Sequence, residues 1–184
     1  MKALRLCLVF TVICGLIYPL AATGVAQVIF PSQANGSLIK KDNQVVGSKW
    51  IGQNFASEKF FHGRISSIEN DASASGSMNL APSNPELKKR VEASIKRLEK
   101  ENPSMPRTNI PADLVTNSGS GLDPDISVDS ANLQVARVAK ANNLKPDAVQ
   151  KLITNNTTTR SLGIFGEPRV NVLELNLALE KLLD

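Results

Sequence analysis

The chain has 184 residues, of which 42% are hydrophobic and only 4% aromatic. It is therefore long enough for one domain with a core of Leu, Ile, Val and Ala. Lys2 and Arg5 precede an apolar leader, and removing them from the 21 basic residues leaves 19 against 17 acidic ones. That balance, without a basic stripe interleaved with aromatic side chains, argues against nucleic-acid binding.

No charged residue occurs from Leu6 to Phe30, a run of 25 residues. A helix needs about 20 apolar residues to cross the hydrocarbon core of a bilayer. The sequence therefore predicts a membrane-spanning helix over residues 1–30, with the basic N-terminus in the cytoplasm. Residues 31–184 would form one compact extracytoplasmic domain of a single-pass protein in the cell (inner) membrane.

A cleavable signal peptide is the alternative, because a basic start and an apolar stretch precede the small residues Gly24 and Ala26. The apolar run continues through residues 28–30, further than a signal peptide needs, which favours the anchor. Both interpretations export the rest of the chain. Both cysteines lie inside the leader, so the exported part has no disulfide and depends on its core alone.

Four short β-prone pieces lie between residues 37 and 63: SLI, QVVGS, WIGQ and KFFHG. Separated by Gly, Asn and Lys–Asp, they predict a small antiparallel meander. Residues 66–84 are rich in Ser, Ala, Asn and Gly, and predict a long irregular loop. A helix follows, with Asn84 as its expected N-cap and Pro85 in its first position. Asn102 should end it.

The second half of the chain predicts mainly helices. The stretch 106–116 reads as an extended strand, and 126–142 as a helix. Pro146 begins a second short helix. A turn-rich segment over 160–170 leads to a leucine-rich core helix over 171–183. Together these elements predict an α+β fold with a small sheet and several helices.

The exported part offers little catalytic machinery. His62 is the only histidine, and no cysteine outside the leader could act as a nucleophile. Asp123, Asp125 and Asp129 lack the order of ligands of an EF-hand. Helix capping by Asp125 or Ser127 is therefore favoured over metal binding. Neither a catalytic site nor a metal site is predicted.

The loop NSGSGLDP (117–124) raises the question of phosphate binding. It is too short for a P-loop, and no lysine follows it. Its amides could form an anion nest at a helix start. A tight connection with positive φ at Gly119 and Gly121 is favoured instead. Gln134 and Arg137 lie one helical turn apart on a polar face, where they could make a joint contact, although such pairs are more often solvated.

Four stretches resemble, in order, the successive signatures of the KdpC family, the C subunits of the Kdp potassium-transporting P-type ATPases. They are SGSMNLAPSNP (75–85), LVTNSGSGLDPDIS (114–127), LQVARVAKANNL (133–144) and LGIFGEPRVNVLELNLAL (162–179). The leader and GSKWIGQNF (47–55) fit the same family. Each motif alone is weak, but four in order are specific, and the resemblance spans nearly the whole chain.

The resemblance implies a non-catalytic accessory subunit of a high-affinity ATP-driven potassium uptake complex. Its partners would be a channel-like potassium-binding subunit and an ATP-hydrolysing subunit. One implied role is a catalytic chaperone that raises the ATP affinity of the pump subunit; the other is a cap over the outer potassium entrance. The nucleotide-binding candidates that the first role implies are Ser118, Gly119, Ser120, Gly121, Gln134 and Arg137.

The two implied roles conflict, because a domain exported by this leader would not meet cytoplasmic ATP. The chain would have no cofactor of its own and would meet ATP only through the complex. A function of another class stays open: an exported soluble binding protein or enzyme, released by cleavage near Ala26.

Three stretches depart from the usual family pattern. Asp125 stands where the family commonly has His, and Asn156 and Thr158 fall in NNTTTR (155–160), which replaces a His–Thr–Glu–Gly–Arg-like stretch. Arg64 also lacks the usual following proline. Roles that need those side chains are therefore not expected here, whereas roles of the backbone are unaffected.

Overall fold

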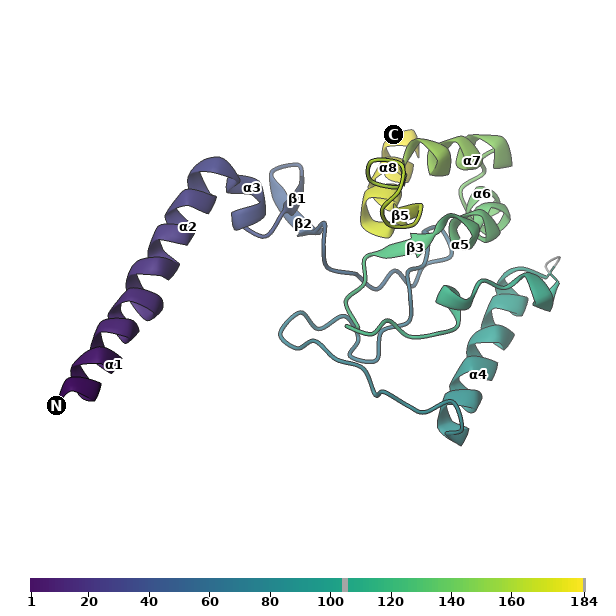
Figure 1. Ribbon diagram of the computed structural model, residues 1–184. Helices are drawn as coiled ribbons and strands as arrows, with labels where there is room; N and C mark the ends of the chain where they lie inside the picture. The colour runs from purple at the N-terminus through teal and green to yellow at the C-terminus, as the bar shows by residue number, and fades with distance from the viewer. Residues whose placement is uncertain (104–105, 184) are drawn as a thin grey trace. The chain divides into compact units, whose positions relative to one another are not determined.

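The computed structural model describes residues 1–103 and 106–183. The chain separates into two compact units, an N-terminal unit (Met1–Ser48) and a C-terminal unit (Lys49–Asp184). Helices dominate both, and each contains one small antiparallel sheet (Figure 1). The predicted α+β fold is confirmed. The predicted boundary of a membrane segment at residue 30 stays a prediction.

The N-terminal unit begins with an apolar helix from Lys2 to Ile29, which contains an 18-residue stretch with a mean hydropathy of 2.2 and no buried residue. It consists of α1 (Lys2–Val12), a π-helical turn (Ile13–Ile17) and α2 (Tyr18–Ile29). The wide turn has a local cause. Pro19 has no amide hydrogen, and its ring would collide with the carbonyl four residues earlier in a regular helix. With 28 residues, the helix is long enough to cross a membrane.

A short helix, α3 (Pro31–Ala34), leads to a hairpin of β1 (Leu38–Lys41) and β2 (Gln44–Ser48). Asp42 and Asn43 form its two-residue turn with φ of 49° and 65°. Positive φ at both positions is typical of the turn whose twist matches that of antiparallel strands. The predicted pieces SLI and QVVGS are confirmed as strands.

The other two predicted strands, WIGQ and KFFHG, are wrong, because residues 49–84 form neither helix nor strand. The backbone there finds side-chain partners instead of a neighbouring strand: the amide of Phe61 donates to Asn176 and that of His62 to Gln134, both at 2.8 Å. The predicted irregular loop over 66–84 is confirmed.

The next helix, α4 (Pro85–Glu101), follows its sequence signals closely. The Asn84 side chain accepts a hydrogen bond from the amide of Glu86 at 2.9 Å, which satisfies one of the free donors at the helix start. The helix ends before Asn102, as expected. The strand predicted over 106–116 is wrong. Two 3₁₀ turns, Arg107–Asn109 and Ala112–Leu114, replace it, and each follows a proline that cannot donate to a strand ladder.

The remaining elements alternate short strands with helices. They are β3 (Asp125–Ser127), α5 (Val128–Leu133), α6 (Val135–Ala141), α7 (Pro146–Asn155), β4 (Thr157–Thr158), β5 (Arg169–Asn171) and α8 (Val172–Leu183). The strands pair antiparallel in the order β3-β5-β4. The helices predicted from Pro146 and over 171–183 are confirmed. The helix predicted over 126–142 begins two residues late, because Ile126 joins the sheet. It is also interrupted at Gln134, which lies between α5 and α6.

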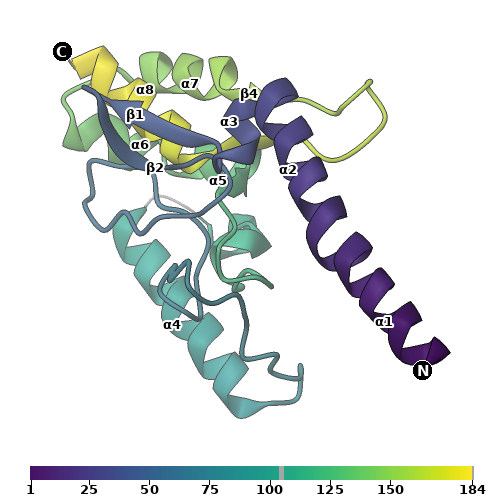
Figure 2. The ribbon, with the colours of Figure 1, turned by 90° about the vertical axis from the view of Figure 1, so that its left-hand side faces the viewer.

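The core of the C-terminal unit lies between this sheet and the helices α5 to α8, while α4 lies at the other end of the same unit (Figures 1 and 2). Its buried members are mostly aliphatic, as the composition predicts, with one aromatic ring, that of Phe61. Phe61 comes from the irregular segment, which therefore contributes directly to the core.

Candidate functional site

The Ser–Gly loop (residues 117–122) is closed by its own serines. Ser118 Oγ accepts a hydrogen bond from the amide of Gly121 at 3.0 Å, and Ser120 Oγ accepts one from the amide of Leu122 at 3.1 Å. Ser118 is buried, whereas Ser120 lies at the surface. Both hydroxyls thus bind amides of the loop itself, which is the bonding that a turn of this kind requires.

The irregular segment before α4 wraps the same loop. The amide of Ser118 donates to the carbonyl of Ile65 at 3.0 Å, and the amide of Gly76 donates to the carbonyl of Ser120 at 2.8 Å. Ser66 Oγ donates to the carbonyl of Gly121 at 2.6 Å. The Ser–Gly loop is therefore one side of a contact with residues 65–77, and hydrogen bonds between the two segments hold it.

The two glycines of the loop have different roles. Gly121 has φ of +72°, and a Cβ built there would lie 2.6 Å from Cγ1 of Ile68. The predicted positive φ is confirmed at this residue. At Gly119 the prediction is wrong: its φ is not positive, and a Cβ there would meet nothing within 4 Å. Only Gly121 is required by both conformation and space.

The start of α5 confirms one of the two predicted caps. Ser127 is the N-cap, and its Oγ accepts a hydrogen bond from the amide of Ser130 at 3.1 Å. Asp113 completes the cap by accepting from the amide of Ser127 at 2.8 Å and from the Ser130 hydroxyl at 2.6 Å. Asp125 lies in β3 instead. Asp113 was not predicted, since it lies on a separate 3₁₀ turn.

Gln134 and Arg137 form a buried bracket around residues 58–62, so the expected solvated pair is wrong. Only 1% of Gln134 and 7% of Arg137 is exposed. Gln134 Oε1 accepts from the amide of His62 at 2.8 Å, and its Nε2 donates to the carbonyl of His62 at 3.1 Å. Arg137 donates to Gln134 Oε1 at 2.6 Å and to the carbonyl of Phe60 at 3.0 Å.

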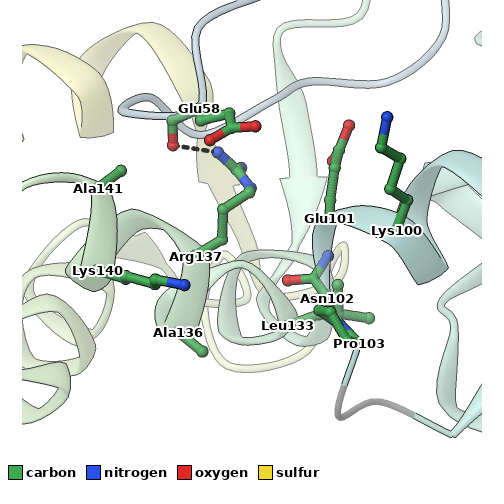
Figure 3. A pocket seen from close by; sticks show the side chains of 10 residues that line it. All are labelled: Glu58, Lys100, Glu101, Asn102, Pro103, Leu133, Ala136, Arg137, Lys140 and Ala141. Carbon is green, nitrogen blue, oxygen red and sulfur yellow. Dashed lines mark hydrogen bonds between the residues drawn. The ribbon is translucent and has the colours of Figure 1, made fainter.

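A further bond of the bracket, from Arg137 to the carbonyl of Glu58, is drawn in Figure 3. Two asparagines extend the same pattern. Asn176 on α8 accepts from the amide of Phe61 at 2.8 Å and donates to its carbonyl at 3.0 Å. Asn142 donates to the carbonyl of Lys59 at 2.8 Å. These asparagines were not predicted, because the partners they bind are 83 and 115 positions away in sequence.

A cavity of about 750 Å³ lies beside the bracket, between the end of α4 and the outer face of α6 (Figure 3). Its charged lining residues are Glu58, Lys100, Glu101, Arg137 and Lys140. Arg137 is the only one of the six nucleotide candidates among the described residues that line it. The candidates therefore fall in two places, the Ser–Gly loop against residues 65–77 and the bracket against residues 58–62.

Burial and pairing shift the pKa values of charged groups around the cavity. Burial lowers the pKa of Arg137, although Glu101 and Glu58 act in the opposite direction. A hydrogen bond with His62 lowers the pKa of Glu101 more than burial raises it. The His62 ring lies 3.6 Å from this carboxylate. With charges of both signs on its lining, the cavity suits a polar partner, but the guanidinium is already bonded to backbone carbonyls.

Of the three residues that depart from the family pattern, Asp125 and Asn156 have side-chain partners within the C-terminal unit, whereas Thr158 is exposed. Asp125 lies 2.8 Å from the Arg169 guanidinium, and burial raises the pKa of its carboxyl despite that charge. Asn156 donates to the carbonyl of Leu152 at 2.8 Å at the end of α7. Thr158 is exposed in β4, opposite Arg169.

A sequence model of the family described as "KdpC: K+-transporting ATPase, c chain" matches residues 1–181. The chain belongs to the KdpC family. It is 57% identical to the potassium-transporting ATPase KdpC subunit of Bacillus cereus (strain Q1) and 56% identical to that of Bacillus anthracis (strain CDC 684 / NRRL 3495). Both comparisons span 181 residues, 98% of this chain and 94% of the relative. The apolar helix, the Ser–Gly loop and the bracket all lie within the length shared with these KdpC subunits.

Proposed function

We propose that the chain is a non-catalytic accessory subunit of a high-affinity, ATP-driven potassium uptake complex. The observation that carries the proposal is the KdpC match, which includes the N-terminal apolar helix as well as both compact units. The partners would be a channel-like potassium-binding subunit and an ATP-hydrolysing subunit. Neither a catalytic site nor a nucleic-acid partner is part of the proposal.

The apolar helix would anchor the chain as a single-pass protein of the cell (inner) membrane. Its 28 residues exceed the roughly 20 that a span requires. Lys2 and Arg5 would hold the N-terminus in the cytoplasm, in accord with the positive-inside rule. This orientation would place the C-terminal unit outside the cytoplasm.

Of the two roles considered for this subunit, the geometry favours one in assembly and at the outer potassium entrance. The serine hydroxyls of the Ser–Gly loop bind its own amides. Gln134 and Arg137 bind backbone groups of residues 58–62. A catalytic chaperone that contacts nucleotide through these six residues would have to break such bonds, which is costly for buried groups.

Purification through an affinity tag on the C-terminus, in mild detergent from the native membrane, tests the proposal. We expect the tagged chain to bring down the other ATPase subunits, and the preparation to hydrolyse ATP in response to potassium. A tagged chain that is recovered alone, without potassium-stimulated ATPase activity, would contradict it.

The alternative, an exported soluble protein, rests on the small residues Gly24 and Ala26 near the end of the apolar stretch. Intact mass spectrometry of the purified chain decides between the two. A mass that includes residues 1–26 supports the anchored subunit, whereas a mature protein that begins at Gln27 supports release by cleavage.

A further inference from the structure

The loop between β4 and β5 presents three large apolar side chains to solvent. Leu162 is 87% exposed, Ile164 73% and Phe165 64%. The other exposed large apolar side chains described in the C-terminal unit are between 46% and 58% exposed. We call these three residues the apolar tip. Figure 2 shows the loop after β4 projecting away from α7 and α8 of the same unit.

Backbone hydrogen bonds and an ion pair join the two ends of this loop at its base. Ser161 and Phe165 exchange two backbone hydrogen bonds, of 2.8 and 2.9 Å. Arg160 and Glu167 form an ion pair of 2.9 Å across the two ends of the loop. The apolar tip is therefore held on a closed turn, which reduces the entropy that it would lose on binding.

The backbone at the tip is strained. Leu162 has φ of +53°, a conformation that side chains larger than Asn or Asp rarely adopt, and Gly163 follows with φ of +75°. Such strain persists only where it serves the fold or a contact. Here the side chain that it positions is 87% exposed and packs little against its own domain, which points to a contact outside this chain.

The charged residues of this loop indicate what kind of partner the apolar tip binds. The three charged residues of segment 160–169 are all paired: Arg160 with Glu167 at 2.9 Å, and Arg169 with Asp125 at 2.8 Å. An anionic membrane surface attracts unpaired Lys and Arg side chains, and this loop presents none. A neutral, rigid apolar tip fits an apolar cleft on a protein surface, where a few large side chains contribute most of the binding energy.

We infer that the apolar tip docks into an uncharged apolar cleft on the extracytoplasmic surface of another subunit of the same ATPase. The inference rests on the proposed function, which supplies both the other subunits and the outward placement of the C-terminal unit. Because the chain also carries the apolar helix, anchoring by that helix would keep the tip near the partner surface, which raises its effective concentration there.

A photocrosslinking amino acid in place of Ile164, in the full chain within its native membrane complex, tests the contact directly. The matched control carries it at Leu183, which is 46% exposed at the end of α8. We expect an adduct with another ATPase subunit from position 164 and none from 183. Adducts with lipid only, with a second copy of this chain only, or with nothing would overturn the inference.

A double variant, Ile164→Ser with Phe165→Ser, measures the strength of the contact. We expect its retention of the partner subunits during stringent washing to fall about tenfold or more, as is usual when large apolar side chains are removed from the centre of an interface. Leu183→Ser should retain them. Unchanged thermal unfolding of the double variant would show that the loss is not a folding defect.

These measurements separate the two proposals. If the unaltered chain brings down no other subunit, the proposed function fails, and the docking inference fails with it. If the unaltered chain and the double variant retain the partners equally, only the docking inference fails.

Discussion

The Ser–Gly loop and the Gln134–Arg137 bracket both bind backbone groups with polar side chains, but they do so in different environments. Ser120 and Gly119 of the loop are exposed, and the serine hydroxyls bind amides within three positions along the chain. The bracket is almost completely buried and binds backbone groups that are more than 70 positions away. The loop thus fixes a local turn, whereas the bracket fixes the tertiary position of residues 58–62.

The difference shows why residue type alone is a weak guide to ligand contacts. A buried backbone carbonyl must have a hydrogen-bond partner, and residues 58–62 have no strand or helix to provide one. Gln134 and Arg137 supply the missing partners. The comparison predicts that substitutions in the bracket cost most, that Gly121 comes next, and that the exposed residues of the loop cost little.

The largest effect should follow from Arg137→Ala. The variant removes the donors for the part-buried carbonyls of Glu58 and Phe60 and for the buried Oε1 of Gln134. We expect the free energy of unfolding to fall by about 3–5 kcal/mol, because several hydrogen bonds from a charged donor are lost together and each contributes about 1.5–3 kcal/mol. Chemical denaturation of the full chain in detergent measures it.

Arg160→Ala is the control, because this residue forms an exposed ion pair. Such pairs contribute about 0–1 kcal/mol. Equal losses for the two arginine variants would show that the bracket does not hold the fold in the way described.

Gly121→Val should have the next largest effect. Its backbone has φ of +72°, and the added Cβ would lie 2.6 Å from the Ile68 side chain and 2.8 Å from the carbonyl of Gly76. Strain and overpacking together predict a loss of about 2–4 kcal/mol. The same substitution at Gly119, where nothing lies within 4 Å, should cost about 0.5 kcal/mol or less. A reversal of this order would contradict the structure of the loop.

The contrast between these glycines also shows what the sequence could predict. Local signals were reliable where one short stretch contains all the information, as at Asn84 and Pro85 at the start of α4 and at Ser127 before α5. The role of Gly121 follows from a loop composition that favours positive φ, but nothing local distinguishes it from Gly119. The close approach of Ile68, 53 positions earlier, makes the difference.

Long-range partners explain the other errors. KFFHG has the composition of a strand, but its amides bind the side chains of Gln134, just before α6, and of Asn176 on α8. In WIGQ the amide of Gly52 instead donates to the carbonyl of Leu122 at 2.7 Å. Ile126 fits the periodicity of a helix, yet it pairs with Val170 in the sheet. Of the six nucleotide candidates, sequence reasoning located the loop but missed the burial of Gln134 and Arg137.

Alanine variants of the two serines should differ less in stability than the valine variants of the two glycines. Ser118→Ala removes a buried acceptor from the amide of Gly121, and we expect a loss of about 1 kcal/mol. Ser120 is exposed, so Ser120→Ala should change stability by about 0.5 kcal/mol or less. Denaturation midpoints under identical conditions compare the two. A larger loss at Ser120 would show that the loop is packed differently.

The smallest effect should come from Glu101→Gln, which changes how the stability of the fold depends on pH. The His62 contact lowers the pKa of this carboxyl below its ordinary value of 4.5. The stability it contributes is therefore fully present above about pH 4.5 and is lost as the pH falls through the lower folded pKa. We expect Glu101→Gln to flatten the decline of the unfolding midpoint in acid. An identical decline in both proteins would show that the pairing is absent in solution.

The most direct test of the structural role assigned to the nucleotide candidates is the ATP concentration that gives half-maximal turnover in a complex containing Gly119→Val. A valine at this exposed position should leave the fold intact, because its Cβ meets nothing within 4 Å. It would nevertheless obstruct a phosphate group bound against the loop. The account predicts the same half-saturating ATP concentration as in the unaltered complex. An increase of about tenfold or more, with normal assembly, would contradict it and support nucleotide binding by the Ser–Gly loop.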